Sequence, residues 1–234
     1  MKKFTLSCLL MLFSISTYAQ QGQLAQFAIW KPKEGQLQNF ENGYKKHLNW
    51  HKSNGDTWNW YAWFIISGPR YGQFVDATFN HSWMDFDHAV KPVEDLVDNR
   101  LHVFPFADIQ TVFKVIKLPQ QSLVDTFNIK QRLIRVITLD VNSLEPALKV
   151  IDRLKENYKS GNIKSFTTYK VIDGGETRQL LLLLGFNNWE EYASSEAIDE
   201  KITAMDTALT TASIAKITSE TMVFRPDLSL FQNN

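Results

Sequence analysis

Two histidines four residues apart have the clearest chemical potential in this sequence. His47 and His51 lie in segment 37–53, whose apolar residues recur at helical spacing. On such a helix, His51 falls within the apolar face and His47 borders it. Imidazoles at positions i and i+4 can share a metal ion or flank a planar ligand. A core histidine with one satisfied nitrogen gives the same pattern, so both interpretations stay open.

A metal site would need a third ligand, and no motif in the sequence supplies one. His81 or Asp76 would complete the site only if folding brings either residue close to His47 and His51. Metal ligands are therefore not assigned from the sequence. Haem and a divalent metal both stay open as cofactors, and a motif supports neither.

Aromatic residues after this helix form a second candidate for ligand binding. Trp58, Trp60 and Trp63 follow one another in a strand-like segment, and large ring faces that line a cavity suit a flat apolar ligand. Such rings also fill barrel interfaces without binding anything. The candidate ligand-binding residues are His47, His51, Trp58, Trp60, Trp63 and His81.

The elements that must position these residues occur twice. The stretch from Phe79 to Trp83 returns from Phe186 to Trp189, each time after an apolar run, at an offset of about 107 residues. Each half reads as strand, helix, strand, strand, helix and strand, which is the order of a ferredoxin-like unit. The predicted elements are residues 23–30, 37–53, 57–67, 71–79, 82–100 and 111–118, then 133–139, 144–158, 165–172, 179–186, 198–209 and 219–225.

The middle strands indicate how the two units assemble. Both alternating sets of residues in 58–66 are largely apolar, and residues 180–184 are all leucine, so both faces of each sheet should be buried. Helices of one unit cover only one face. The predicted fold is therefore α+β, with two tandem ferredoxin-like (βαββαβ) units packed sheet to sheet as an α/β barrel. One continuous sheet, or unlike positions of Trp83 and Trp189, would contradict the repeat.

In element order and in the tryptophan that follows the third strand, the chain resembles the dimeric α/β-barrel superfamily in a tandem-repeat form. That superfamily includes antibiotic-biosynthesis-type monooxygenases, haem-degrading monooxygenases and chlorite dismutases. The resemblance implies a ligand cavity between helix and sheet. Haem-degrading members use an asparagine on the first strand and a tryptophan and a histidine on the second helix; here the first strand and residues 90–100 lack them. Haem-bearing tandem relatives place their axial histidine in the second half, which has none here.

Three functions follow from these patterns. The favoured one is binding of a small molecule, such as a small aromatic ligand, through an aromatic cavity in the first unit. The alternative is a monooxygenase-like enzyme, cofactor-free or haem-linked, with His51 as base or ligand. A structural or interaction module is the second alternative. Because no nucleophilic triad, phosphate-binding loop or paired-carboxylate motif is recognisable, the sequence leaves open whether the protein is an enzyme.

Composition and the first residues predict where the protein works. Residues 1–19 have the layout of a signal peptide, with Lys2 and Lys3 before a short apolar stretch and small residues at Thr17 and Ala19. We expect an exported protein, periplasmic or extracellular, without a membrane span. Its 25 basic and 25 acidic residues form no basic stretch, which argues against a nucleic-acid partner. The oligomeric state is left open.

The predicted organisation has five parts. The signal peptide is followed by two ferredoxin-like units that are joined by a linker, and a short tail ends the chain. Their bounds are 1–19 for the signal peptide, 20–118 for the first unit, 119–129 for the linker, 130–228 for the second unit and 229–234 for the tail.

Cleavage after Ala19 is a testable expectation. The exported protein should begin at Gln20 and contain no thiol, because the only cysteine, Cys8, precedes the cleavage site. Intact mass spectrometry and thiol titration of exported material measure both properties. A lipid-modified or thiol-bearing product would contradict the expectation.

Overall fold

The structure is a computed structural model that describes residues 22–123, 129–159, 163, 165–209 and 212–232. The predicted signal peptide and residues 124–128 of the predicted linker lie outside these ranges. The first half contains β1 (Leu24–Pro32), α1 (Leu37–Ser53), β2 (Trp60–Ser67), β3 (Phe74–His81), α2 (Trp83–Asp87), α3 (Pro92–His102) and β4 (Ala107–Lys117). The second half contains β5 (Leu133–Val141), α4 (Leu144–Tyr158), β6 (Ser165–Asp173), β7 (Gln179–Phe186), α5 (Trp189–Ala193), α6 (Ile198–Thr207) and β8 (Ile214–Phe224).

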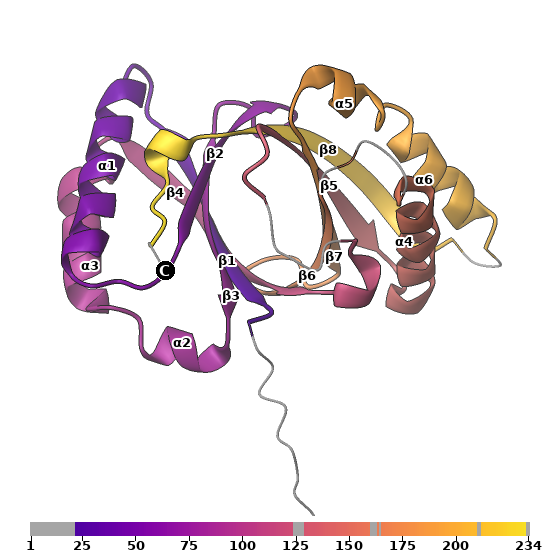
Figure 1. The fold of residues 1–234 in the computed structure, drawn as a ribbon, viewed down its shortest axis with the longest axis horizontal. Coiled ribbons are helices and arrows are strands. Elements are labelled where there is room, and N and C mark those ends of the chain that lie inside the picture. The colour runs from indigo at the N-terminus through magenta and orange to yellow at the C-terminus, as the bar shows by residue number, and fades with distance from the viewer. Residues whose placement is uncertain (1–21, 124–128, 160–162, 164, 210–211, 233–234) are drawn as a thin grey trace, which may run out of the picture.

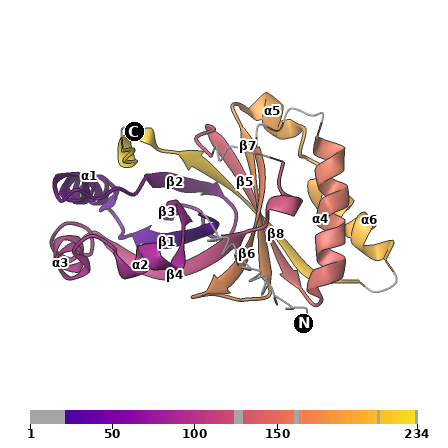
Figure 2. The same ribbon diagram turned by 60° about the horizontal axis from the view of Figure 1, so that its bottom comes forward.

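The eight strands form one closed barrel in the order β1-β3-β2-β8-β5-β7-β6-β4. Every neighbouring pair is antiparallel. Each half contributes four adjacent strands, and the halves are joined at the pairs β2–β8 and β4–β6. The helices α1 and α3 lie on one side of the barrel, and α4 and α6 lie on the opposite side (Figures 1 and 2).

This closure corrects one expectation. The predicted α+β class and element order are present, but the strands form one closed sheet rather than two sheets packed face to face, so this test of the repeat is not met. Twisted four-stranded sheets leave unpaired backbone groups at their edges, and hydrogen bonding between the edges of the two halves removes this liability. The sheet faces that were expected to oppose each other consequently line one barrel interior.

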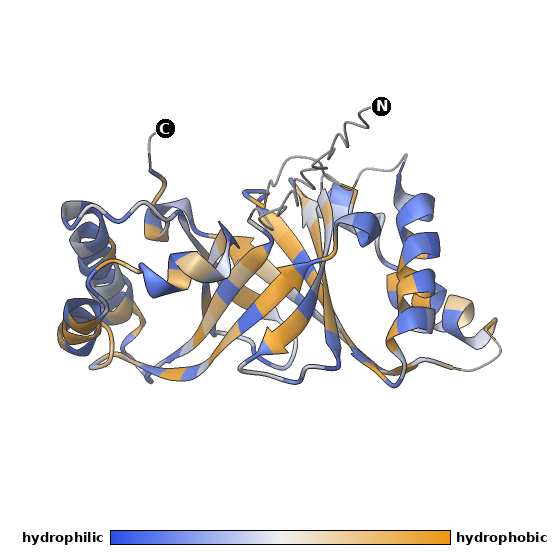
Figure 3. Ribbon diagram, turned by 90° about the horizontal axis from the view of Figure 1, so that it is seen from below, coloured by the Kyte–Doolittle hydropathy of each residue, from blue (hydrophilic) through white to orange (hydrophobic). Residues whose placement is uncertain are grey.

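The alternation of side chains along the strands separates the core into layers. On β2, Tyr61 and Trp63 point into the barrel interior, whereas Ala62 belongs to the cluster beneath α1 and α3. On β7, Leu181 and Leu183 face the interior. The alternate residues Leu180, Leu182 and Leu184 pack against the second-half helices. The strands are accordingly mostly hydrophobic, and the helices are more hydrophilic (Figure 3). Both faces of the central strands are buried, as the sequence predicted.

Local signals place the helix boundaries near the site. Asn54 caps α1, and Gly55 follows with a φ of 73°, a backbone conformation that favours glycine. The long helical region expected over 82–100 is two helices. Pro92 begins the second one, because a proline lacks the N–H that the preceding helix would need but suits the first turn of a new helix.

Trp83 and Trp189 occupy the same place in their halves. Each is the first residue of the short helix that follows the third strand, and each side chain is about half exposed, at 56% and 50%.

The C-terminal segment belongs spatially to the first half (Figure 1). Leu230 and Trp60 exchange two backbone hydrogen bonds of 2.8 and 2.9 Å. Arg225 forms an ion pair of 2.6 Å with Glu41 of α1. The described part of the predicted tail is therefore packed against β2. Among the described residues, no helix is long and apolar enough to cross a membrane.

A glycine at the α1–α3 contact provides a test of this packing. A Cβ atom at Gly43 would lie 1.8 Å from the backbone oxygen of His102, so an alanine there forces the two helices apart. Glycine to alanine normally stabilises a helix interior by about 1 kcal/mol. Here we expect Gly43→Ala to lower the free energy of unfolding by about 1–3 kcal/mol, as overpacking does. Denaturant unfolding measures this, with the exposed α1 position Lys46→Ala as the control. A stabilised Gly43→Ala variant would contradict the packing.

Candidate functional site

Helix α1 presents its two histidines toward the inside of the molecule. His47 and His51 are buried, with 4% and 2% of their surface exposed. They share the buried face with Tyr44 and Leu48, which pack in the cluster between the helix and the sheet. The helical phase inferred from the sequence is therefore present, and His47 is as buried as His51.

Helix α3 faces α1 with polar side chains. Asp95, Asp98, Asn99 and His102 follow at the spacing i, i+3, i+4 and i+7, which places them on one face of the helix. The apolar residues of α3 are directed to solvent: Val93, Val97 and Leu101 are 71%, 50% and 66% exposed. This inverted arrangement requires that α1 provides polar partners, and the two histidines do so.

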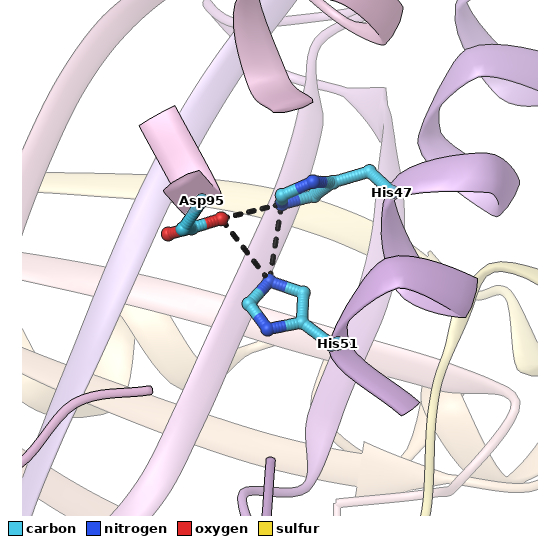
Figure 4. A group of neighbouring side chains, drawn as sticks. All are labelled: His47, His51 and Asp95. Carbon is cyan, nitrogen blue, oxygen red and sulfur yellow. Dashed lines mark hydrogen bonds and ion pairs between the residues drawn. The ribbon is translucent and has the colours of Figure 1, made fainter. Parts of the chain in front are cut away.

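The centre of the site consists of three side chains from these two helices (Figure 4). The Nε2 atoms of His47 and His51 lie 3.1 Å apart. Asp95 Oδ1 lies 3.3 Å from His47 Nε2 and 3.5 Å from His51 Nε2. Two imidazole nitrogens and one carboxylate oxygen thus converge on one point, and together they could hold a metal ion.

The Nδ1 atom of each histidine lies against a carboxylate of its own. Asp98 Oδ2 lies 2.8 Å from His47 Nδ1, and its other oxygen lies 3.0 Å from His102 Nδ1. Asp56 Oδ2 lies 2.8 Å from His51 Nδ1. Asp98 in this position fixes the tautomer and the orientation of the His47 ring, whereas the contact between Asp56 and His51 lacks hydrogen-bond geometry.

Asp56 is itself held by the chain that follows it. Its carboxylate accepts hydrogen bonds of 2.9 Å from the Trp58 backbone N–H and from the Trp60 indole. Burial opposes its ionisation, but the contacts with His51 and these two donors lower the pKa of Asp56 below its ordinary value. The loop between α1 and β2 therefore positions a charged carboxylate against His51.

Burial determines the protonation of the other groups. It lowers the pKa of His47 to about 4, an effect that the nearby His51 increases and Asp98 opposes. Burial also raises the pKa of Asp95. At neutral pH the His47 imidazole is therefore neutral, and with its Nδ1 proton directed to Asp98, its Nε2 atom is an electron-pair donor.

A pocket of about 320 Å³ opens beside these residues. His51, Asp56 and Asp95 form its polar side, and Trp58, Trp60 and Phe86 contribute aromatic walls. A second cavity of about 400 Å³ lies in the barrel interior and is lined mostly by apolar residues. Arg70 and Glu220 at that cavity are paired with each other, and Asp140 accepts a hydrogen bond from Gln179. Lys216 also lines that cavity, but no histidine does, so the pocket beside His51 differs in offering an imidazole group.

The structure brings together four of the six predicted site residues. His47, His51, Trp58 and Trp60 lie at or beside the pocket. The His81 ring contacts the Trp58 ring at a tilt of 42°, with ring centroids 4.2 Å apart, and His81 lies outside the central group. Trp63 is fully buried in the barrel interior, because strand alternation directs residues 61 and 63 away from α1.

The third candidate metal ligand and the other polar partners of the two histidines were not among the predicted site residues. Asp95 takes the place for which His81 and Asp76 were considered, and Asp56, Asp98 and Asn99 complete the surroundings. The polar spacing on α3 was a usable signal for three of them. Asp56 had no helical pattern to mark it, since it lies in a loop.

The geometry does not fit haem. The Nε2 atoms of His47 and His51 face each other at 3.1 Å, and Asp95 and Asn99 surround them. An axial histidine needs its nitrogen directed at an open flat space. The two rings are instead turned toward each other, and a macrocycle cannot pass between them.

Comparison with known proteins shows the fold but no close relative. No known protein family and no curated protein match this sequence. A candidate monooxygenase from Lactobacillus acidophilus NCFM is 11% identical with a TM-score of 0.59, covering 91% of this chain and 97% of that chain. An anthrone oxidase-like protein is 10% identical with a TM-score of 0.53, covering 88% and 93%. A candidate chlorite dismutase is 8% identical with a TM-score of 0.59, covering 88% and 96%.

These similarities concern the fold. The chain has the α+β-barrel fold of the superfamily to which the monooxygenase-like and chlorite dismutase-like structures belong. Identities of 8–11% carry no information on substrate or cofactor.

Asp76, on β3 beneath α1, should make stability depend on pH. Burial raises its pKa to about 7, although the Trp30 indole donates a 2.8 Å hydrogen bond to it. The unfolded carboxyl ionises near 3.8, so between about pH 4 and pH 7 the folded state binds more protons than the unfolded state. Stability contributed by this group is therefore present below pH 3.8 and lost as the pH rises to about 7.

We expect Asp76→Asn to remove a slope of up to about 1.4 kcal/mol per pH unit from the free energy of unfolding in this range. Urea unfolding of both proteins at several pH values measures the difference. Asparagine keeps an oxygen that can accept the Trp30 hydrogen bond, so the variant is matched in shape. Parallel pH profiles for the two proteins would show that Asp76 ionises normally.

Proposed function

We propose that the chain is a monooxygenase-like enzyme that acts on a small aromatic substrate in the pocket beside His51. One observation carries the proposal: a cavity of about 320 Å³ has Trp58, Trp60 and Phe86 along its walls and a buried histidine–carboxylate cluster at its side. Aromatic walls suit a flat ring, and strongly coupled titratable groups in a cavity are typical of active sites. Structures with this fold include a candidate monooxygenase and an anthrone oxidase-like protein, so the assignment also has an analogy of fold beside it.

The proposed substrate class is a phenol or a ring-activated methylene compound. In the reaction of such a methylene, a base removes a proton, the carbanion reacts with dioxygen, one oxygen atom stays on the carbon as a ketone and the other leaves as water. The substrate supplies the electrons, so this reaction needs no external reductant. His51 lies at the pocket wall, where it would accept the proton or bind a metal ion that activates the substrate.

The proposal extends to origin and location. Both halves have the same order of elements and the same four-strand arrangement, which supports their origin by duplication. The composition of residues 1–19 supports export, with the enzyme acting in the periplasm or outside the cell. We also propose that the two duplicated units are residues 20–118 and 130–228.

A second candidate function is docking to another macromolecule. Helix α3 exposes the apolar residues Val93, Leu96, Val97 and Leu101, which lie along one side of the helix. Exposed apolar stripes of this kind are typical of interaction surfaces. Light scattering of the purified protein, with Val97→Lys as the comparison, tests whether this stripe holds a partner copy.

Binding of aromatic compounds tests the enzyme proposal directly. Phenols and anthrone-like compounds should quench tryptophan fluorescence, since Trp58 and Trp60 line the pocket. Trp58→Ala should weaken binding about tenfold, which corresponds to about 1.4 kcal/mol of lost ring contact. Trp189→Ala is the matched control, because Trp189 is a half-exposed tryptophan in the other half.

Turnover is measured as dioxygen consumption and product formation with the compounds that bind. His51→Gln should abolish turnover and retain binding if the proposal is right. Binding without turnover by the wild type would favour a binding protein. If the panel neither binds nor reacts, the pocket has no aromatic substrate of this class.

A further inference from the structure

We infer that His47, His51 and Asp95 bind a divalent first-row transition metal ion through His47 Nε2, His51 Nε2 and Asp95 Oδ1. The inference depends on the proposed function only where it treats the ion as the cofactor of that pocket. The geometry of the three ligand atoms is independent of the proposed function. The three atoms come from two helices and lie within 4.8 Å of one another. None of the three residues belongs to a metal-binding sequence motif.

The spacing of the three atoms matches a coordination sphere. Ligands at about 2.1 Å from a metal stand about 3.0 Å apart at right angles and about 3.4 Å apart at the tetrahedral angle. The observed separations are 3.1, 3.3 and 3.5 Å. One ion between these atoms can therefore meet ordinary ligand distances with small side-chain movements.

The outer carboxylates lie against both histidines. Asp98 accepts a 2.8 Å hydrogen bond from His47 Nδ1, so His47 keeps an electron pair on Nε2. Asp56 Oδ2 lies 2.8 Å from His51 Nδ1 as a close contact that lacks hydrogen-bond geometry. The 3.1 Å contact between the two Nε2 atoms and the 3.0 Å contact from the Asn99 amide nitrogen to His47 Nε2 are the hydrogen bonds that a metal ion would replace. A metal ion at this point would form three bonds, to His47 Nε2, His51 Nε2 and Asp95 Oδ1.

Charge supports the same occupant. Asp56, Asp95 and Asp98 surround two imidazoles, and only Asp98 has another histidine, His102, at 3.0 Å. Asp56 and Asp98 are 7% and 9% exposed. Clustered carboxylates in a mostly buried site are unfavourable unless a cation compensates them. A divalent ion supplies two positive charges at the point where the ligand atoms converge.

The donor set selects the class of metal. Two imidazole nitrogens with one carboxylate suit iron, cobalt or zinc, whereas magnesium and calcium prefer oxygen ligands. Because His51 and Asp95 line the pocket, the remaining coordination positions would face it. The Asn99 amide nitrogen lies 3.0 Å from His47 Nε2 and also donates to Asp95 Oδ1 at 3.2 Å, so Asn99 orients two of the three ligands.

Metal binding to the purified, exported full chain tests the inference. After treatment with a chelator, the protein is dialysed against Co²⁺ or Zn²⁺, and bound metal is counted by mass spectrometry. We expect one ion per chain, d–d absorption bands for the cobalt form, and quenching of tryptophan fluorescence by Co²⁺, since the rings of Trp60 and His51 are 4.3 Å apart.

Variants distinguish this site from surface binding. Asp95→Asn and His51→Gln should weaken Co²⁺ binding at least about 100-fold, and Asp98→Asn about 10- to 100-fold, as loss of an outer partner does. The control is His88→Gln, because His88 is an exposed histidine. Its affinity should equal that of the wild type. Circular dichroism establishes that each variant is folded; if His51→Gln is not, the half-buried Asp95 carries the test.

Three outcomes overturn the inference: a folded wild type that binds no metal, an ion that binds equally well to Asp95→Asn, or loss of binding in His88→Gln. The first would indicate that a shared proton joins His47 and His51. Titration of metal-free protein with the aromatic panel is independent of these results. Aromatic binding without metal binding refutes the metal site alone, and metal binding without aromatic binding refutes the proposed substrate.

Discussion

Closure of the barrel is the constraint on which the remaining structure depends. The central strands carry apolar residues on both faces, so one face must pack against helices and the other must line an enclosed interior. The pairs β2–β8 and β4–β6 provide that enclosure by satisfying the backbone groups at the sheet edges. Each half thereby becomes a rigid platform with its helices on the outer face, and the site lies under one such pair of helices.

Both helix pairs cover one face of the barrel strands, but they do so with different kinds of side chain. In the second half, α4 and α6 cover the sheet with apolar residues such as Ile151, Leu154 and Ile202. In the first half, α1 and α3 meet through a histidine–carboxylate cluster, and α3 exposes much of its apolar side. Buried polar groups stabilise a fold less reliably than an apolar core does. The buried His47 and His51 and their carboxylates lie at this one helix pair, which is consistent with a site that is kept for its chemistry.

The second half also contributes to the geometry of the first. The C-terminal segment pairs with Trp60 through Leu230, and Arg225 anchors α1 through Glu41. Trp60 in turn donates a hydrogen bond to Asp56, which lies against His51. A continuous chain of contacts therefore runs from the end of the chain to the cluster. The first unit alone lacks these supports, so the two halves are structurally interdependent.

The sequence by itself determined the periodic features of this protein. Apolar periodicity and the repeated strand–helix order predicted the elements, the α+β class and the inward direction of His51, because these depend on residues close together in the chain. Only the tertiary structure decided which edges join, that Trp63 faces the barrel interior, and that Asp95 rather than His81 or Asp76 meets the two histidines. The contacts of Asp95 with His47 and His51 join residues 48 and 44 positions apart, and their geometry depends on the packing of α3 against α1, which local spacing does not encode.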